Sequence, residues 1–372
     1  MPNPNAIVSR VIRIDPPLDR PDGDDRGFTI TLENDRSVRI DPADRASAGR
    51  ARGVDGLRVQ RTPVYLEIDP TTSFVTRLLI PYVTRVQGIR PLDVGVLSVE
   101  IEQSHARHLL RANGPDAAEL EAVLRESLRA RMPVTVAETD AHEIIDVRPF
   151  RPDPEGLPPV PRPEYPPIAP WSFAWIKHWL WCVWRCRWWP WWWFRCLSPT
   201  RAQQVFDSMS ATSCAPLTVP PPCIPFMYPD DGCWGRASEM CRLMIALGLS
   251  PKKVWIQGNL HADSKNNPNC FVNWGWHVAP TLCVRGPKFW QARDMVIDPS
   301  LFTTPVSQAT WKGVQGDPSA TLTPTSAAIF MIFGMSTDPT YAQTNTVLAN
   351  YRLTLLNRSI GPSGPPPYAA CP

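Results

Sequence analysis

The chain has 372 residues, of which 43% are hydrophobic and 20% are charged. This is an ordinary globular composition, so it excludes wholesale disorder, and the length predicts two or three domains. Lysine and arginine total 38 against 35 acidic residues, and a net charge of +3 gives no reason to expect a nucleic-acid partner.

Tryptophan and cysteine divide the chain into two dissimilar halves. All 16 Trp and all 10 Cys fall after residue 170. Residues 1–150 carry a net charge of −3 and the remainder +6. Opposite signs favour docking of one half on the other, although salt screens such modest charges over about 8 Å.

The N-terminal sequence MPNPNAIVSRVIRIDPP lacks an apolar run long enough for a signal peptide, and no stretch reaches the roughly 20 apolar residues of a spanning helix. The cysteine density is typical of chains that meet an oxidising compartment. Secretion or export by a route that needs no N-terminal signal would reconcile the two observations.

Residues 1–90 alternate short β-rich runs with Asp, Pro and Gly turn signals, which predicts a small antiparallel barrel or sandwich. The expected strands cover residues 7–14, 27–33, 57–60, 64–69 and 74–80. Residues 91–150 predict an α/β unit with a strand at 94–102, a helix at 115–131 whose leucines recur every four residues, and two further strands in MPVTVAE and HEIIDV.

Two unusual segments follow. Residues 151–170 hold nine prolines and predict a semi-rigid linker, whereas residues 171–197 hold ten tryptophans together with Lys177, Arg185, Arg187 and Arg195. The Trp/Arg-rich composition is typical of membrane-active peptides, so we expect contact with a membrane interface. His178, Cys182, Cys186 and Cys196 could hold zinc, but the usual C-x2-C spacing is missing, and packing or a disulfide is favoured. Stacking of this segment on single-stranded nucleic acid is a minor alternative.

Residues 198–372 have the composition of a mixed α and β domain. Helices are expected at 202–209 and 233–247, the second ended by Gly248. Strands are expected at 253–257, 274–284 and 294–297. Cys214 and Cys223 close a short proline-rich loop, for which a disulfide is favoured over a metal pair.

The segment YPDDGCWGRASEM places Cys233 in the first turn of a helix. Free backbone N–H groups and the helix dipole favour a thiolate there, as a cysteine nucleophile requires. A lone cysteine at a helix start is more often structural, so the interpretation needs a base.

His277, 44 residues later in NWGWHVAP, can supply the base, and Asp298 in MVIDPSLF can orient it. Taken singly, His277 could be a packed core histidine and Asp298 a turn former. The order of nucleophile, base and carboxylate, with the last two on neighbouring strands, favours a catalytic Cys233–His277–Asp298 triad.

These motifs resemble those of the bacterial protein glutaminases, over about residues 198–320. The resemblance rests on Tyr228, Pro229, Asp231, Gly232, Cys233, Arg236 and Ala237 of a YP-x-DGC-x-x-R-A motif, on Trp274, His277, Val278 and Ala279 of W-x-x-H-V-A, on IDPSLF at 297–302, on GNL-x-A at 258–262, and on the Cys214 and Cys223 loop. Ser238, where the family has His, and a single Cys270, where it has two cysteines, depart from the pattern.

The resemblance implies an α+β catalytic domain of the transglutaminase-like, papain-type class at residues 198–372. It implies cysteine-dependent deamidation of glutamine side chains in proteins or peptides through a thioester, with no cofactor and no metal. Trp234, Trp274 and Trp276 are candidates to line the substrate cleft. Transglutaminase-like acyl transfer and cysteine proteolysis are the enzymatic alternatives, and a membrane-active protein or effector is the alternative of another class.

A weaker resemblance covers residues 94–147, which follow the order and phrasing of the pro-region of the same family. It implies an inhibitory unit that covers the catalytic cleft until the linker is cut. Within it, Gly95 to Glu102 is the candidate for the strand near Cys233. A plain adaptor or targeting domain is the alternative for residues 91–150.

Overall fold

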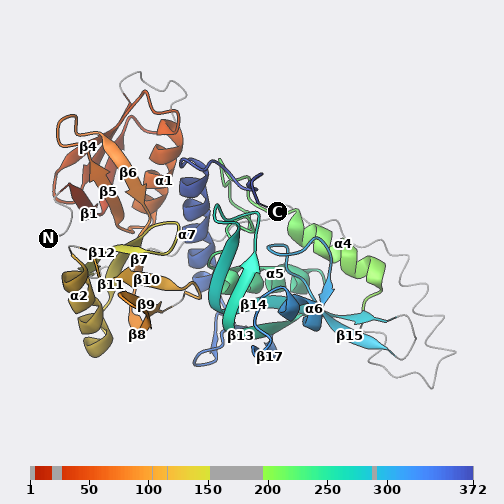
Figure 1. The fold of residues 1–372 in the computed structure, drawn as a ribbon. Helices are drawn as coiled ribbons and strands as arrows, with labels where there is room; N and C mark the ends of the chain where they lie inside the picture. The colour runs from red at the N-terminus through yellow and green to blue at the C-terminus, as the bar shows by residue number, and fades with distance from the viewer. Residues whose placement is uncertain are drawn as a thin grey trace.

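The structure is a computed structural model, and it describes residues 5–18, 27–102, 104–114, 116–150, 196–286 and 291–371. Within these residues the fold is a mixture of α-helices and several small antiparallel sheets (Figure 1). The proline-rich segment 151–170 and all but two residues of the Trp/Arg-rich segment 171–197 lie outside the described residues.

The N-terminal part contains two three-stranded sheets packed with one helix. The sheets have the orders β1-β5-β6 and β2-β3-β4, and the elements are β1 (Ala6–Ser9), β2 (Val11–Asp15), β3 (Phe28–Leu32), β4 (Ser37–Ile40), α1 (Ser47–Val59), β5 (Val64–Ile68) and β6 (Val75–Leu79). The expected strand at 57–60 is wrong, because α1 runs through Val59. Ala51, Val54 and Leu57 recur at helical spacing and are fully buried, so burial of that face favours a helix.

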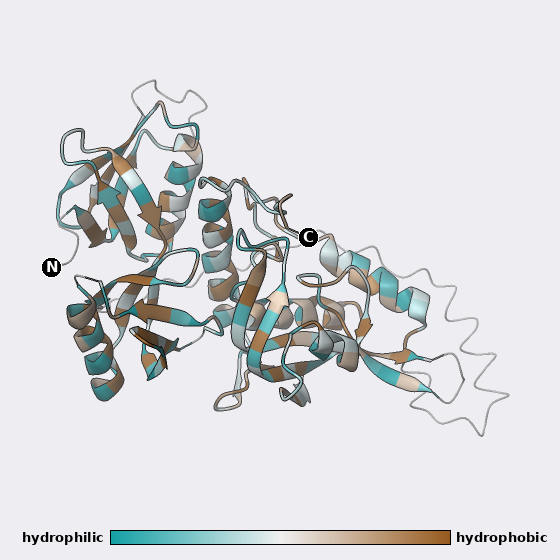
Figure 2. Ribbon diagram, in the orientation of Figure 1, coloured by the Kyte–Doolittle hydropathy of each residue, from teal (hydrophilic) through white to brown (hydrophobic). Residues whose placement is uncertain are grey.

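The second part begins at Tyr82, before residue 91 where the sequence places it. Its sheets have the orders β10-β9-β8 and β12-β11-β7, and its elements are β7 (Tyr82–Thr84), β8 (Val86–Asp93), β9 (Val96–Ile101), β10 (His108–Arg111), α2 (Ala117–Ala130), β11 (Val134–Glu138) and β12 (Ile144–Pro149). Leu120 and Leu124 of α2 lie in its core, and α2 in Figure 2 carries hydrophilic residues on its outer face.

The C-terminal part is built on a five-stranded antiparallel sheet of order β16-β15-β14-β13-β17. Its elements are α4 (Pro199–Ser210), α5 (Cys233–Ala246), β13 (Lys252–Asp263), β14 (Phe271–Arg285), β15 (Ala292–Val296), β16 (Val306–Ser307), α6 (Gln308–Gly313), β17 (Thr321–Ser326), β18 (Ile329–Met331), β19 (Ser336–Thr337) and α7 (Ala342–Ser359). Helix α5 packs on β14, and Gly248 ends it with a positive φ of 74°, as expected for a residue that follows a helix.

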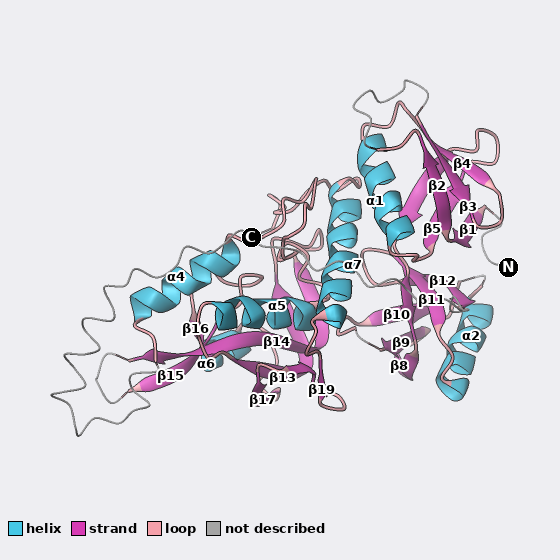
Figure 3. Cartoon of the chain, turned by 180° about the vertical axis from the view of Figure 1, so that it is seen from behind, coloured by secondary structure: helices cyan, strands magenta, loops and turns pink. Residues whose placement is uncertain are grey.

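Helix α7 joins the parts of the molecule. Figures 1 and 3, seen from opposite sides, both place it between the five-stranded sheet of the C-terminal part and the N-terminal elements. Leu353 of α7 lies in the core of the N-terminal part, and Tyr351 lies in the core around Cys233. The Asn357 side chain donates to the Leu78 carbonyl over 3.1 Å, so a single helix supports two cores.

Three disulfides stabilise the C-terminal part. Cys214 and Cys223 are joined, with Cα atoms 4.9 Å apart, and Cys196 is joined to Cys283 and Cys270 to Cys371. Cys196 is therefore not available as a fourth zinc ligand for His178, Cys182 and Cys186, which lie outside the described residues. No helix of the described residues is long and apolar enough to cross a membrane.

Candidate active site

Cys233 begins helix α5 at the centre of the C-terminal part. Gly232 precedes it with a φ of 79°, and a Cβ atom at Gly232 would lie 2.4 Å from the Tyr351 ring. Only glycine fits this turn without strain. The Arg236 guanidinium donates to the carbonyls of Tyr228 and Asp231 and so holds the turn that presents Cys233.

His277 and Asp298 lie together beside Cys233. His277 is in β14, and Asp298 follows β15, the strand paired with β14. His277 Nε2 is 2.9 Å from Asp298 Oδ2, and this carboxylate oxygen also accepts from Trp311 Nε1 over 2.9 Å. One ring nitrogen of His277 and the Cys233 sulfur lie within 4.8 Å of each other. The structure thus brings the three residues of the expected triad together.

The pKa of Asp298 reflects this pairing. Burial alone would raise it, but His277 and the hydrogen bond from Trp311 hold the pKa of Asp298 below its usual value. The carboxylate is therefore ionised near neutral pH and can fix the His277 tautomer. Trp311, whose side chain is fully buried, was not selected from the sequence, where a single Trp in WKG carries no motif.

The Cys233 thiol differs from the expectation drawn from its position at a helix start. Burial raises the pKa of Cys233 well above its usual value, and the nearby Arg236 charge opposes this only in part. The side chain is 1% exposed. In this covered state burial favours the thiol form of Cys233 over the thiolate.

The segment that covers Cys233 comes from the second part of the chain. Nδ1 of His105 is 3.4 Å from the Cys233 sulfur and 2.8 Å from Oδ1 of Asp231. The Gly275 N–H donates to the His105 carbonyl over 3.0 Å, and Ala106 forms an antiparallel bridge with Trp274. The segment 104–107 thus lies against β14 as a short added strand.

The prediction that Gly95 to Glu102 forms the strand covering Cys233 is wrong, because the covering residues come later in the chain. The main part of this segment is β9, which pairs with β8 and β10 in its own sheet, and the residues that reach Cys233 come after it. Ser98 to Ile101 line a cleft shared with Ser104 to Arg107, Gln257, Asn259, Gly275 and Trp276. Backbone groups of β9 are used in its sheet, which leaves the following loop to reach into the cleft.

Three tryptophans surround the His105 imidazole. Its ring centroid is 5.9 Å from that of Trp234, 5.5 Å from Trp274 and 5.1 Å from Trp276. Trp274 also stacks on His277 at 4.5 Å with planes 11° apart. The residues expected to line the substrate cleft therefore enclose a side chain of the same protein. No feature of the segment SHARH distinguishes His105 before the fold is known.

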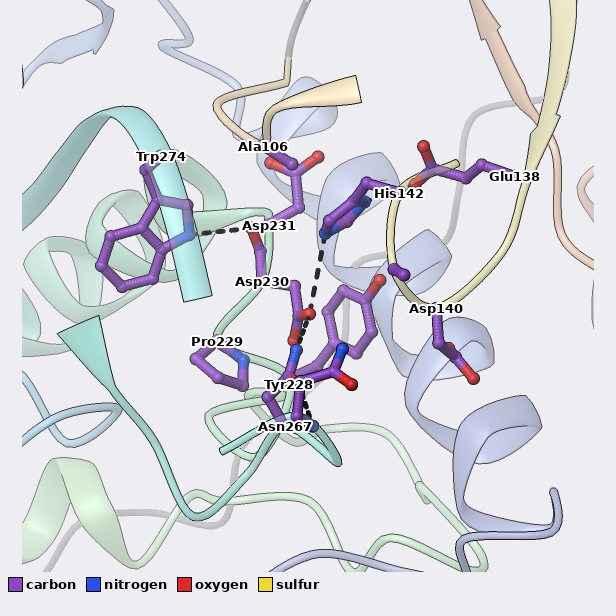
Figure 4. A network of polar contacts seen from close by, with 12 residues as sticks. Ala106, Glu138, Asp140, His142, Tyr228, Pro229, Asp230, Asp231, Asn267 and Trp274 are labelled. Carbon is purple, nitrogen blue, oxygen red and sulfur yellow. Dashed lines mark hydrogen bonds and ion pairs between the residues drawn. The ribbon is translucent and has the colours of Figure 1, made fainter. Parts of the chain in front are cut away.

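A buried ionic network connects the second part of the chain (residues 82–149), the covering unit, to the turn before Cys233. Asp230 receives two hydrogen bonds from Arg358 of α7, at 2.6 and 3.1 Å, and its Oδ1 is 3.6 Å from His142 Nε2 (Figure 4). His142 and His108 both contact Glu138, at 2.7 and 2.6 Å. Burial would lower the pKa of His142, but Glu138 and Asp230 raise it to about 10, so this contact is ionic near neutral pH.

Comparison with known proteins gives the class of the C-terminal part. Residues 202–315 match the family model described as glutaminase. This part of the chain is similar to the glutaminase family over those residues, and the match supports a hydrolase that acts on amide C–N bonds.

The fold has counterparts among solved structures. The crystal structure of a pro-protein-glutaminase is similar at a TM-score of 0.50 and 21% identity, over 79% of this chain and 99% of that one. A crystal structure of protein-glutaminase, at 27% identity and a TM-score of 0.38, covers 48% of this chain and 98% of its own. The NMR structure of protein-glutaminase from Chryseobacterium proteolyticum, at 28% identity and a TM-score of 0.39, covers 48% and 97%. None of the curated proteins matches the chain.

Proposed function

We propose that this chain deamidates glutamine side chains in proteins or peptides, with Cys233 as the nucleophile. The observation that carries the proposal is the buried His277–Asp298 pair beside a cysteine at the start of a helix. The glutaminase family match supports the amide substrate, and the protein-glutaminase counterparts support a glutamine held within a protein.

In the first half of the reaction, Cys233 attacks the carbon of the glutamine γ-carboxamide. His277 takes up the thiol proton, and the C–N bond then breaks as the imidazolium passes a proton to the departing ammonia. This leaves a thioester between the sulfur and the γ-carbonyl. Asp298 stabilises the imidazolium and remains ionised throughout, consistent with its lowered pKa.

In the second half, His277 takes a proton from water, whose oxygen attacks the thioester carbonyl. The C–S bond breaks, the thiolate is reprotonated, and the product is a glutamate side chain. Transfer of the acyl group to an amine would make the enzyme a transglutaminase, and attack on a backbone amide would make it a cysteine protease. The family match favours water as the acceptor and a side-chain amide as the substrate.

The chain in this form is proposed to be latent. A substrate glutamine has to approach the Cys233 sulfur, and the His105 ring and the backbone of residues 104–107 fill that approach. A segment tethered in the same chain has a high effective concentration, so even weak affinity excludes a substrate. The membrane-interface role of residues 171–197 remains a separate proposal, because those residues lie outside the part that the structure describes.

The mechanism is tested by ammonia release from a protein with exposed glutamines after the linker has been cut. We expect Cys233→Ser to abolish release and His277→Ala to do nearly as much, with no further loss in the double variant, because the two residues act as a unit. Asp298→Asn should lower the rate while the fold stays intact. Backbone cleavage or amine incorporation in place of ammonia release would assign one of the two alternative activities.

A further inference from the structure

Three potential metal ligands meet at the covered active site. One ring nitrogen of His105, one of His277 and the Cys233 sulfur all lie within 4.8 Å of one another. The three side chains are 2%, 1% and 1% exposed. Thiolate sulfur and imidazole nitrogen are the donors that Zn²⁺ prefers in proteins.

His277 already has the tautomer that a metal ligand needs. Its Nε2 lies 2.9 Å from Asp298 Oδ2, and this contact favours a proton on Nε2. This leaves a lone pair on Nδ1, which is buried and has no hydrogen-bond partner. A metal-bound histidine ordinarily donates its other N–H to a carboxylate, which fixes the ring and raises its basicity.

The distances around His105 fit a shared ion. Nδ1 of His105 is 3.4 Å from the Cys233 sulfur and 2.8 Å from Asp231 Oδ1. With Zn–N bonds of about 2.1 Å and Zn–S bonds of about 2.3 Å, two ligand atoms on one tetrahedral ion are about 3.5 Å apart. An ion bound to Nδ1 in place of its proton would therefore also lie within bonding distance of the Cys233 sulfur, next to the Asp231 carboxylate.

The charges of the site also favour a cation. Two carboxylates lie beside the proposed ligands, with Asp231 Oδ1 2.8 Å from His105 Nδ1 and Asp298 Oδ2 2.9 Å from His277 Nε2, whereas Arg236 supplies one positive charge. A zinc ion bound to a Cys233 thiolate adds a net charge of one and would balance this set. Burial of a divalent ion requires such compensation.

We propose that the intact chain binds one zinc ion through Cys233, His277 and His105. Cys233 and His277 belong to the C-terminal part of the chain, and His105 belongs to the covering segment 104–107. The ion would therefore hold this segment in the cleft and block the nucleophile. The proposal goes beyond deamidation, and its test reads metal binding and not enzymatic activity.

The experiment is a titration of the metal-free, full-length chain with Co²⁺, a spectroscopic substitute for zinc. We expect one equivalent to bind with a thiolate-to-cobalt charge-transfer band, which zinc then displaces. Cys233→Ser should remove the band, and His105→Phe, which keeps a ring in the pocket without a nitrogen, should remove tight binding. Asp298→Asn should weaken binding by about 10- to 100-fold, the usual effect of losing an outer-sphere carboxylate.

A matched control separates this site from the cysteines of residues 171–195, which lie outside the described residues. The double variant Cys182→Ser, Cys186→Ser leaves residues 105, 233 and 277 intact and should bind Co²⁺ as the parent does. Thermal unfolding of each metal-free variant shows whether it is folded. Absence of the band in the parent chain, its persistence in Cys233→Ser, or its loss only in the double variant would each overturn the proposal.

Discussion

His105 lies 3.4 Å from the Cys233 sulfur, at the position where the proposed mechanism requires a substrate side chain. Its imidazole lies among Trp234, Trp274 and Trp276, and its backbone bonds to Gly275 of β14. The sequence motifs contain the residues that form this pocket but not the residue that fills it. A histidine within SHARH has no spacing of its own, and its partner Asp231 is 126 positions away in the chain.

The burial of His105 predicts a pH dependence of latency. Burial lowers the pKa of His105 to about 4, against the opposing effect of Asp231, whereas an undocked His105 has the ordinary value of 6.5. As the pH falls from 6.5 towards 4, the undocked state takes up a proton that the docked state does not, so docking weakens. Docking is therefore strongest above pH 6.5.

This prediction can be measured as the rate of Cys233 alkylation by iodoacetamide in the intact chain. His105→Phe serves as the matched variant, because it keeps Cys233 and its neighbours Asp231, His277 and Arg236 and removes only the imidazole that titrates. We expect the ratio of the parent rate to the variant rate to rise on acidification across this range. A ratio independent of pH would contradict the assignment.

At the scale of single elements, local patterns predicted α2, α5 and β14 well. Burial follows the apolar periodicity in α2, whereas α5 and β14 are buried along most of their length, and Gly248 ends α5 as expected. Helix α7 was not predicted, because its buried residues lie on several faces of the helix and give no apolar periodicity in the sequence. Thr344, Asn345, Arg352 and Arg358 are polar and buried, since α7 is enclosed by two parts of the molecule. Such polar burial cannot be inferred without knowing the partner elements.

The turn that presents Cys233 provides a test at this scale. Gly232→Ala would place a Cβ atom 2.4 Å from the Tyr351 ring at a φ of 79°. We expect a loss of about 2–4 kcal/mol in the free energy of unfolding, from backbone strain and overpacking together. Chemical denaturation of the two proteins measures this loss.

Gly248→Ala is the matched control, because Gly248 also has a positive φ, 74°, but has no atom within 4 Å of an added Cβ. It should lose only the backbone contribution, about 1–2 kcal/mol. Equal losses in the two variants would show that the contact with Tyr351 does not constrain the Cys233 turn.

At the scale of the whole molecule, α7 and the ionic network around Asp230 hold the covering unit against the C-terminal part of the chain. Arg358 is 1% exposed and bonds to Asp230 on one side and to Asp140 of the second part on the other, at 3.2 Å. The difference in net charge between the two halves suggested docking but could not identify these residues, which are brought together from three distant parts of the chain.

Removal of this arginine should be costly. Arg358→Met leaves the Asp230 carboxylate buried without its bidentate partner, and we expect a loss of about 3–5 kcal/mol in the free energy of unfolding. Arg129→Met is the control, because Arg129 pairs with Glu126 on the exposed side of α2. That exposed pair should contribute at most about 1 kcal/mol. Losses of similar size in both variants would contradict a structural role for the buried network.

The central claim is that a cysteine-dependent deamidase is held covered by its own N-terminal half. The most direct measurement is ammonia release from a glutamine-bearing protein by the intact chain, by the chain cut within residues 151–170, and by the cut Cys233→Ser variant. The account predicts slow release by the intact chain, a large increase after cleavage, and none from the variant. Equal release before and after cleavage would contradict the covering role, and undiminished release by the Cys233→Ser protein would contradict the assignment of the nucleophile.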